Sequence, residues 1–509
     1  MKKIYFSLIL LLSMAFASCD MDKAPYGSLD EQTAIQSLND VLRYRNGFYG
    51  ALRGMTSGYW IYDQEIQMDG FLGTISNGNR EGEFSNGTIN SSTYDIEDFW
   101  SVPYYYIQEA NYIIPKIDEL IASGSFDDDE ITDMKRYQGE AHFLRAFCYF
   151  WLADKYCPAY TSSIGDTQAK GVPIVTTYAP SGNVESYPSR STLNETFSLI
   201  EEDLAAAYSA LKSYESTDAS AVAPNANYIS SYTVRALQAR VALQKKDNAN
   251  ALKYAKEVIN SGVYSLTTNE TFAAMWTDDE GTEIIFQPFM SNTELGSSIG
   301  GVFLSSDETS ADYLPTYTFA NAYEDTDARY YAYIGEYKLV VEGGQYYAWV
   351  FSKYPGNAAL RTSTTPNFMN MTKPFRLAEQ YLIAAEAAYN TGATSEATNY
   401  LNTLRANRIE GYDTSTGYSA SGLRDEIRTE RVKELFGEGF RMGDLRRWGI
   451  GFKRDSSYPS DIFGYLDDVI VKAGKGMTYA ADDYRFIWPI PSAEIDANPN
   501  LKGQQNPGY

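Results

Sequence analysis

The chain has 509 residues and a formal net charge of −24, from 66 acidic and 42 basic side chains. A surface of this sign repels nucleic acid and anionic lipid headgroups, so neither is expected as a partner, and a polyanionic ligand would need a local basic pocket. The 43 tyrosines and a hydrophobic content of 44% supply a large core and many aromatic faces that tolerate water.

The N-terminus is typical of an export signal that ends at a lipidation site. Two lysines precede an apolar stretch over residues 4–16, and thirteen residues at about 1.5 Å each cannot cross a bilayer core of about 30 Å. The small residues before Cys19, in AFASCD, resemble a bacterial lipobox. We expect residues 1–18 to be a signal peptide, Cys19 to carry lipid such as palmitate, and residues 19–40 to form a tether. A buried or disulfide-bonded Cys19 is the less favoured interpretation.

The other cysteines and the only histidine predict no metal or disulfide chemistry. Cys148 and Cys157 lie nine residues apart on a predicted helix, which separates them by roughly 13 Å, so we expect buried free thiols. His142 alone cannot build an imidazole cluster and is expected to be a packing residue. Acidic clusters at 127–130 and 278–280 could hold Ca²⁺ but fit solvated loops better. No metal or other cofactor is therefore expected.

Two segments repeat each other with the pattern of a tetratricopeptide-like helical hairpin. ARVALQKKDNANALKYAKEVI, from Ala239, aligns without a gap with AEAAYNTGATSEATNYLNTLR, from Ala385. The matched alanines let two helices approach closely around a tight turn. We expect such hairpins over about 137–261 and 376–450. Within them, a helix over 137–156 should pair with 193–211, and 423–435 with the helix that ends at Trp448.

The character of the chain changes between about 265 and 375, where Gly, Ser, Thr, Asn and Tyr dominate. YKLVVEGGQYYAWVFSKY, residues 337–354, predicts a β-hairpin around Gly343 and Gly344. Residues 77–92 form a second loop-rich stretch. Loops carried on a helical frame usually hold the binding residues.

Four motifs together resemble the SusD/RagB family of outer-membrane nutrient-binding lipoproteins from Bacteroidetes. The motifs are RAFCYFWLADKY, RLAEQYLIAAEAAYN, IRTERVKELFGEGFRMGDLRRWG and the closing RFIWPIPSAEIDANPNLKGQQNPGY. The resemblance implies a mostly α, SusD-like fold over residues 41–509, with tetratricopeptide-like hairpins and a loop-rich, partly β insertion. It also implies a lipid-anchored protein on the outer membrane, facing the exterior. Such a protein traps oligosaccharide for a SusC-like TonB-dependent transporter and catalyses no reaction.

Most motif residues are expected to be structural. Glu430, Glu434 and Glu438 recur at i, i+4 spacing among arginines, which predicts an ion-pair network that links helices. The prolines of the last segment predict an extended tail over 485–509, because each fixes φ and excludes helix. The residues with an assigned structural role are Arg145, Glu430, Arg431, Glu438, Arg441, Asp444, Trp448 and Trp488.

A sugar site needs exposed aromatic planes with polar groups between them, because a sugar ring stacks through its C–H face and hydrogen-bonds through its hydroxyls. Trp60, Trp276 and Trp349 lie in loop-like or hairpin contexts and are the candidates, whereas the other tryptophans lie in motifs and are expected in the core. By analogy with the family, whose ligand face combines early loops with the insertion, the further candidates are Asp69, Asn79, Arg80, Tyr94, Tyr313 and Tyr317.

Other functions stay open at this level. GSSIG, residues 296–300, fits the G-x-S-x-G pattern with Ser298 as nucleophile, but the only histidine precedes it, so it is interpreted as a glycine-serine loop. A glycoside hydrolase needs only two carboxylates without fixed spacing and is the less favoured alternative. Peptide capture, which the same family architecture also serves, is the main alternative cargo. A scaffold for protein partners is a third alternative.

Overall fold

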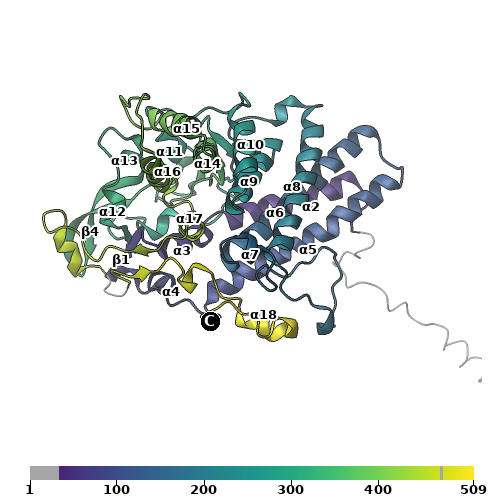
Figure 1. The fold of residues 1–509 in the computed structure, drawn as a ribbon, viewed down its shortest axis with the longest axis horizontal. Helices are drawn as coiled ribbons and strands as arrows, with labels where there is room; N and C mark the ends of the chain where they lie inside the picture. Colours follow the sequence, from purple (N-terminus) through teal and green to yellow (C-terminus); the bar gives the residue numbers. More distant parts are fainter. Residues whose placement is uncertain (1–33, 471–473) are drawn as a thin grey trace, which may run out of the picture.

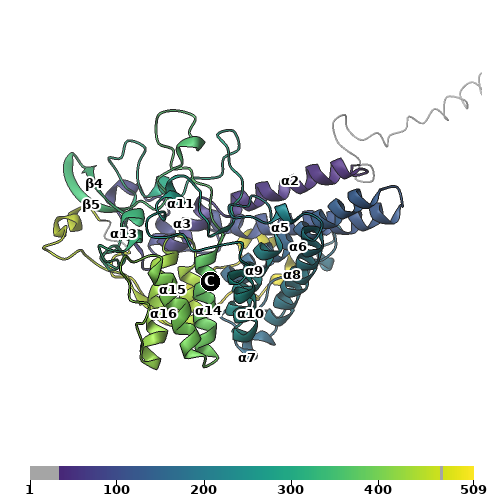
Figure 2. The same cartoon turned by 90° about the horizontal axis from the view of Figure 1, so that it is seen from above.

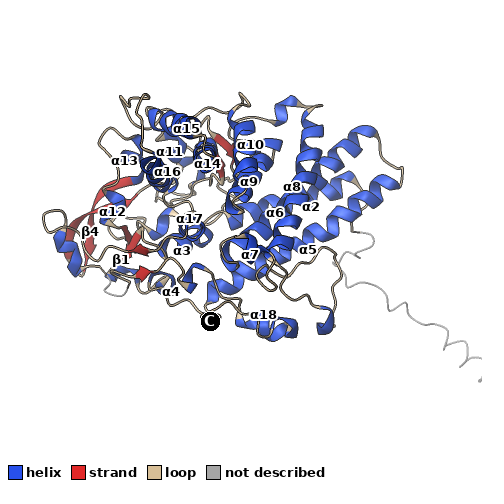
Figure 3. Cartoon of the chain, in the orientation of Figure 1, coloured by secondary structure: helices blue, strands red, loops and turns tan. Residues whose placement is uncertain are grey.

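The computed structural model describes residues 34–470 and 474–509, and it is mostly helical (Figure 1). The expected signal peptide and Cys19 lie outside the described residues. The described strands are short and pair antiparallel in four separate two-stranded sheets. Most of them lie at the end of the molecule opposite the longest helices (Figure 3). In the described part of the chain, no helix is both long and apolar enough to cross a membrane.

Four long helices build one side of the molecule (Figures 1 and 2). The central helix α6 begins at a capping box, in which Asp127 and Glu130 satisfy free backbone N–H groups, and it packs against the other three. Its packing on α8 confirms the pairing predicted for this helix. An ion pair of 2.7 Å between Arg145 and Asp203 links the two helices. The four helices are α2 (Leu38–Met55), α5 (Tyr94–Ala122), α6 (Asp128–Tyr156) and α8 (Leu193–Glu215).

The two repeats form helical hairpins that pack against each other. The alanines at the matched positions, such as Ala239 and Ala385, are fully buried, so the helices pack closely. The second helix of the first hairpin packs on the first helix of the second, although the whole insertion separates them in sequence. A further helix, α16, packs on the second hairpin. The helices are α9 (Ser231–Gln244), α10 (Asn248–Ile259), α14 (Leu377–Asn390), α15 (Thr394–Ala406) and α16 (Ala420–Leu435).

The insertion carries most of the β structure. Its longest sheet is the β4–β5 hairpin, which confirms the hairpin predicted from sequence, although the two loop residues are Glu342 and Gly343 rather than Gly343 and Gly344. Both have positive φ, 49° and 81°, as a tight hairpin turn requires. The pairs are β1 (Phe71–Gly73) with β3 (Tyr313–Pro315), β2 (Ile284–Phe286) with β6 (Phe375–Arg376), β4 (Ile334–Val341) with β5 (Gly344–Phe351), and β7 (Phe452–Lys453) with β8 (Thr478–Tyr479).

Short helices complete the chain and lie mostly in its loop-rich parts. The α-helices are α3 (Tyr59–Ile66), α4 (Gly82–Ser85), α7 (Ser162–Gly165), α11 (Ala274–Thr277), α12 (Tyr317–Ala320), α13 (Ala328–Tyr333), α17 (Arg441–Trp448) and α18 (Ser492–Ala497). The 3₁₀-helices are η1 (Ile75–Asn77), η2 (Val184–Ser186), η3 (Ala219–Ala221), η4 (Gly300–Val302), η5 (Ala358–Leu360), η6 (Gly464–Asp468), η7 (Tyr484–Phe486) and η8 (Pro499–Leu501).

Three expectations about the ends and the pairing need correction. Helix α2 begins at Leu38, capped by Ser37, so the folded body starts inside the tether expected over 19–40. The tail over 485–509 is not extended throughout, because Pro491 caps the short helix α18 and Pro499 is the first residue of η8, so these prolines begin helical turns instead of excluding them. Helix α16 packs mainly on α14 and α15, whereas α17 packs on α3.

The tail is nevertheless fixed to the body by buried polar contacts. The Asn506 side-chain amide donates hydrogen bonds to the carbonyl oxygens of Tyr156 and Trp488, and its oxygen accepts one from Arg190. Cys148 and Cys157 are buried free thiols, as expected from their spacing.

Candidate ligand-binding surface

Aromatic side chains from three separate segments gather at the β4–β5 hairpin. The ring of Trp349 on β5 lies over that of Tyr317 on α12, with centroids 6.3 Å apart and planes 21° from parallel. Phe463 meets Trp349 edge to face at 5.2 Å. Tyr465 stacks on Tyr346 at 5.9 Å. We call these rings, with the neighbouring Tyr347, the aromatic surface: Tyr317, Tyr346, Tyr347, Trp349, Phe463 and Tyr465.

The aromatic surface is open to solvent at Tyr347 and Tyr465, is partly covered at its other rings, and is bordered by charged groups. Tyr347 and Tyr465 are 51% and 44% exposed, and the Tyr465 hydroxyl donates a hydrogen bond of 2.7 Å to the Tyr347 carbonyl. The hairpin register places the exposed Lys338 opposite Tyr347 and the exposed Glu336 opposite Trp349. Flat apolar faces beside charged and hydroxyl groups can stack on a ligand and hydrogen-bond to it at the same time.

A buried apolar cluster holds the hairpin in place beneath these rings. Tyr458 is buried next to Tyr317 and Trp349, and its hydroxyl donates a hydrogen bond to the carbonyl of Pro315 on β3. Because alternate residues of a strand point to opposite faces, the hairpin turns one set of side chains into this cluster. The buried members from the two strands and from the segment around η6 are Leu339, Val341, Ala348, Val350, Leu466, Val469 and Ile470.

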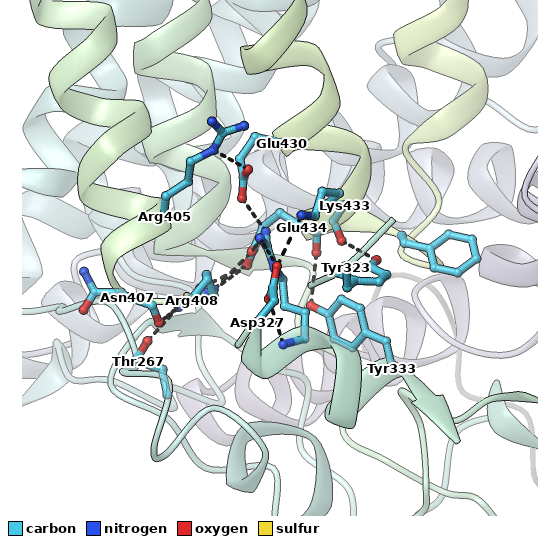
Figure 4. A network of polar contacts seen from close by, with 12 residues as sticks. Thr267, Tyr323, Asp327, Tyr333, Arg405, Asn407, Arg408, Glu430, Lys433 and Glu434 are labelled. Atoms are coloured by element: carbon cyan, nitrogen blue, oxygen red, sulfur yellow. Dashed lines mark hydrogen bonds and ion pairs between the residues drawn. The ribbon is translucent and has the colours of Figure 1, made fainter. Parts of the chain in front are cut away.

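An ion-pair network joins α16 to the insertion (Figure 4). Glu434 lies at its centre and pairs with Arg329, Arg376 and Arg408, all of them buried. Burial by itself raises the pKa of Glu434, but the charges of Arg408, Arg376 and Arg329 outweigh burial and lower that pKa well below its usual value. Glu430, one turn earlier on α16, pairs with Arg329 and Arg405. The predicted network is therefore present, but its partners come from distant segments and its members are buried.

The network continues to the strand that carries Trp349. Lys353, two residues after the end of β5, is fully buried and pairs with Glu438 at 2.6 Å. Burial lowers the pKa of Lys353 to about 8, against the opposing charge of Glu438. Glu438 also pairs with Arg376, which in turn contacts Glu434. Charged contacts thus fix the base of the hairpin to the helical frame.

Comparison with known proteins assigns the family of this fold. Residues 240–509, more than half of the chain, match the SusD family. The chain belongs to the SusD family. Residues 58–243 match a second family, described as starch-binding and associating with the outer membrane. The predicted family and the predicted mostly helical SusD-like fold are both confirmed.

Known proteins resemble the chain over lengths that range from about a quarter of it to the whole. SusD-like protein P2 of Formosa agariphila is 25% identical over 100% of both chains. The starch-binding protein SusD of Bacteroides thetaiotaomicron is 35% identical, over 26% of this chain and 21% of its own. A SusD superfamily structure from Bacteroides thetaiotaomicron has a TM-score of 0.75 at 27% identity and covers 92% of this chain and 100% of that one. A putative sugar binding protein from Bacteroides vulgatus has a TM-score of 0.74 at 27% identity, covering 94% and 100%.

The SusD motif residues have mainly structural surroundings. Asp444 pairs with Arg431 at 2.7 Å and with Arg447 at 2.9 Å. Trp488 is fully buried and its indole N–H donates to Gln67. Trp448 was expected in the core but is only half-buried, because α17 ends at the surface, where its indole N–H donates to Glu386.

Two of the three candidate tryptophans are buried and so present no open plane to a ligand. Trp60 is 4% exposed, because it lies on helix α3 rather than in a loop and packs against Trp151 and Phe99. Trp276 is 1% exposed, since Lys353 and other insertion residues cover it. Tyr313 is likewise buried on β3. Its hydroxyl donates a hydrogen bond to the Arg80 carbonyl.

The polar candidates do not gather into one site with the aromatic surface. Asp69 forms a two-pronged ion pair with Arg441, at 2.8 and 2.6 Å, so its carboxylate is already occupied. Asn79 and Arg80 are exposed on the turn before α4, where Arg80 pairs with Asp312. Tyr94 is 79% exposed at the start of α5, and no ring of the described residues packs against it. Only Trp349 and Tyr317, among all the candidates, stack on each other.

Four members of the aromatic surface escaped prediction. Tyr347 lies two residues before Trp349 in the GQYYAW arm of the predicted hairpin, so alternation along the strand could have indicated it, whereas Tyr346 lies on the opposite face of the strand and contacts Tyr465. Phe463 and Tyr465 lie near the end of a segment without helical or strand periodicity. No local signal indicates that this segment folds back over the hairpin.

A separate cavity of about 100 Å³ lies between the helices and the insertion. Its lining is largely apolar, with Phe150 and Trp151 among the residues. Its buried cations are paired within the protein, as in the contacts of Lys373 with Asp279 and of Arg240 with Glu379. These charges are neutralised within the protein, but Nη1 of Arg431, which also lines the cavity, has no hydrogen-bond partner among the described residues.

Proposed function

We propose that this SusD family protein captures oligosaccharide on the aromatic surface and delivers it to a SusC-like TonB-dependent transporter. The observation that carries the proposal is the partly exposed stack of Trp349 and Tyr317, with the exposed Tyr347 and Tyr465 and charged groups beside it. A sugar ring stacks its C–H face on such rings, and its hydroxyls reach the polar border. The relatives named as starch-binding and sugar-binding proteins support this class of ligand.

The same proposal covers the anchoring and the organisation of the chain. Residues 1–18 act as signal peptide, and lipid on Cys19 holds the protein on the outer membrane, facing the exterior. The remainder forms one SusD-like domain, with the insertion over 265–375 turned toward the ligand. The family described as associating with the outer membrane supports this location.

The protein acts by binding and not by catalysis in this proposal. The hydroxyl of Ser298, in the GSSIG segment, donates a hydrogen bond to the Phe368 carbonyl. His142 lies on α6 and its ring contacts Asp203. The serine of a G-x-S-x-G hydrolase is activated by a histidine within hydrogen-bonding distance, which this arrangement does not provide.

Isothermal titration of the full chain against neutral oligosaccharides, acidic oligosaccharides and mixed peptides tests the proposal. We expect saturable heat with one glycan class, lost in Trp349→Ala and reduced in Tyr317→Ala. Tyr94→Ala removes an exposed ring outside the aromatic surface and should bind as the unaltered chain does. Binding heat with peptides alone would show that the ligand is a peptide and not a glycan. Release of sugar products from the glycans would show that the protein is a hydrolase.

The transporter step needs its own measurement. We expect a large β-barrel protein to co-purify with the lipidated chain, and glycan to increase the yield of the pair. Co-purification without any glycan binding would instead indicate a scaffold for protein partners.

A further inference from the structure

Three carboxylates converge where three segments of the N-terminal part meet. Asp63 lies on α3, Glu81 on the turn before α4 and Asp95 in the first turn of α5. One carboxylate oxygen from each residue lies within 4.8 Å of the other two. The trio lies outside the aromatic surface and is separate from the acidic clusters at 127–130 and 278–280.

The buried member of the trio has no donor group among the described residues, and its carboxyl lies against that of Glu81. Asp63 is fully buried, and neither of its carboxylate oxygens accepts a hydrogen bond. Among the described residues, none of the three carboxylates forms an ion pair with a lysine or arginine, and the nearby Arg80 is engaged by Asp312. Burial raises the pKa of Asp63 well above its usual value, and the negative charges of Glu81 and Asp95 raise it further. A buried carboxylate without compensation is costly, so the fold maintains this cluster at the expense of stability.

We propose that Asp63, Glu81 and Asp95 bind a divalent cation of the Ca²⁺ type. The donor set consists of carboxylate oxygens alone, without histidine or cysteine, which favours a hard cation over zinc or copper. Three carboxylates can supply up to six oxygens, and Ca²⁺ takes six to eight at distances of about 2.3–2.6 Å. Glu81 and Asp95 are half-buried, so the ion can enter from the solvent side while Asp63 closes the inner side. This replaces the sequence-based expectation of no metal.

The ion would hold an exposed turn against two helices. Glu81 directly follows Arg80, whose carbonyl accepts a hydrogen bond from Tyr313 on β3. The turn therefore has one anchor on the insertion side, and the cation supplies another on α3 and α5. Asn79 and Arg80, which lie exposed on this turn, become ordered when the ion binds.

Calcium titration of the full chain tests the site. The protein is stripped with EDTA, dialysed into buffer with 150 mM NaCl and titrated with CaCl₂ by calorimetry, while its thermal unfolding is followed in parallel. We expect one saturable site and a higher unfolding temperature with Ca²⁺, and a weaker response to MgCl₂. Asp63→Asn and Asp95→Asn should each weaken Ca²⁺ binding by about tenfold or more, because the affinity follows the charge of the ligand set.

Glu97→Gln is the matched control, because Glu97 is exposed on the same helix α5, lies outside the trio and changes the net charge equally. It should bind Ca²⁺ as the unaltered chain does. The proposal is overturned if the unaltered chain shows no saturable site, or if Asp63→Asn and Asp95→Asn keep the full affinity. Either result would mean that the Asp63 carboxyl is protonated and binds no cation. Asp95→Asn keeps the test valid if Asp63→Asn fails to fold, since Asp95 is only half-buried.

Discussion

Trp349 and Tyr317 stack on each other with their ring planes 21° apart, although they belong to a strand and a helix that are separated in sequence by α13 and β4. Neither ring is fully covered, and the exposed Tyr347 lies two residues before Trp349 on the same strand. Trp276, in contrast, is packed beneath Lys353 at 4.4 Å. The two tryptophans therefore lie in different surroundings, although the sequence analysis predicted a ligand-binding role for both.

Substitution of the two tryptophans should separate binding from stability. Trp276→Ala should lower the free energy of unfolding by about 3–5 kcal/mol, because it empties a fully buried site. Trp349→Ala should cost less stability, since this ring is half-exposed, but it should abolish glycan binding. Urea unfolding and calorimetry on both variants check this. Equal losses of stability, or glycan binding lost only in Trp276→Ala, would contradict it.

Removal of the central charge of the network should destabilise the protein strongly. Glu434→Gln leaves Arg329, Arg376 and Arg408 with an incompletely compensated buried charge, so we expect a loss of about 3–5 kcal/mol in urea unfolding. Glu426→Gln is the control, because Glu426 pairs with Arg405 near the surface and its side chain is 43% exposed. That pair should be worth at most about 1 kcal/mol. Similar losses in both variants would show that burial does not set the strength of these ion pairs.

Glu65 should make stability fall as pH rises. Burial raises the pKa of Glu65 from 4.5 to about 7, although the N–H groups of Gly439 and Phe440 donate to its carboxylate and Lys353 and Arg441 lie nearby. The folded state therefore binds the proton more tightly, so the penalty is absent below pH 4.5 and complete above pH 7. Between pH 4.5 and pH 8 it amounts to about 3 kcal/mol at most.

Glu65→Gln should remove this penalty. Urea unfolding at pH 5 and pH 8 should show a larger loss of stability in the unaltered chain than in the variant. Glu97→Gln, an exposed control, should follow the unaltered chain. A variant that loses as much stability as the unaltered chain would show that other groups cause the pH dependence.

The ion pair between Asp69 and Arg441 should contribute to stability and not to glycan binding. Its side chains are 12% and 16% exposed and form two parallel hydrogen bonds. A double-mutant cycle with Asp69→Asn and Arg441→Gln should give a coupling free energy of about 1–3 kcal/mol in urea unfolding. Calorimetry should show unchanged glycan affinity in Asp69→Asn. A coupling near zero, or lost glycan binding, would restore Asp69 as a ligand residue.

Local patterns were sufficient to predict the helical frame. Within each repeat two alanines lie three residues apart, Ala239 and Ala242 in the first and Ala385 and Ala388 in the second, and this helical spacing determines which side chains share a face. The hairpin arms around Gly343 are likewise a local feature, since a tight turn needs positive φ at neighbouring residues. The sequence by itself thus determined the family, the repeats and the β-hairpin of the insertion.

Exposure and charge pairing were decided only by the tertiary structure. Trp60 and Trp276 occupy contexts that look like those of surface residues, but segments far away in sequence cover them. The partners of Glu434 and the partly exposed stack of Trp349 on Tyr317 also come from distant segments. Burial, and with it the pKa of a group such as Glu65, depends on which segments meet in space. Contacts between segments that are distant in the chain cannot be predicted from a local sequence pattern.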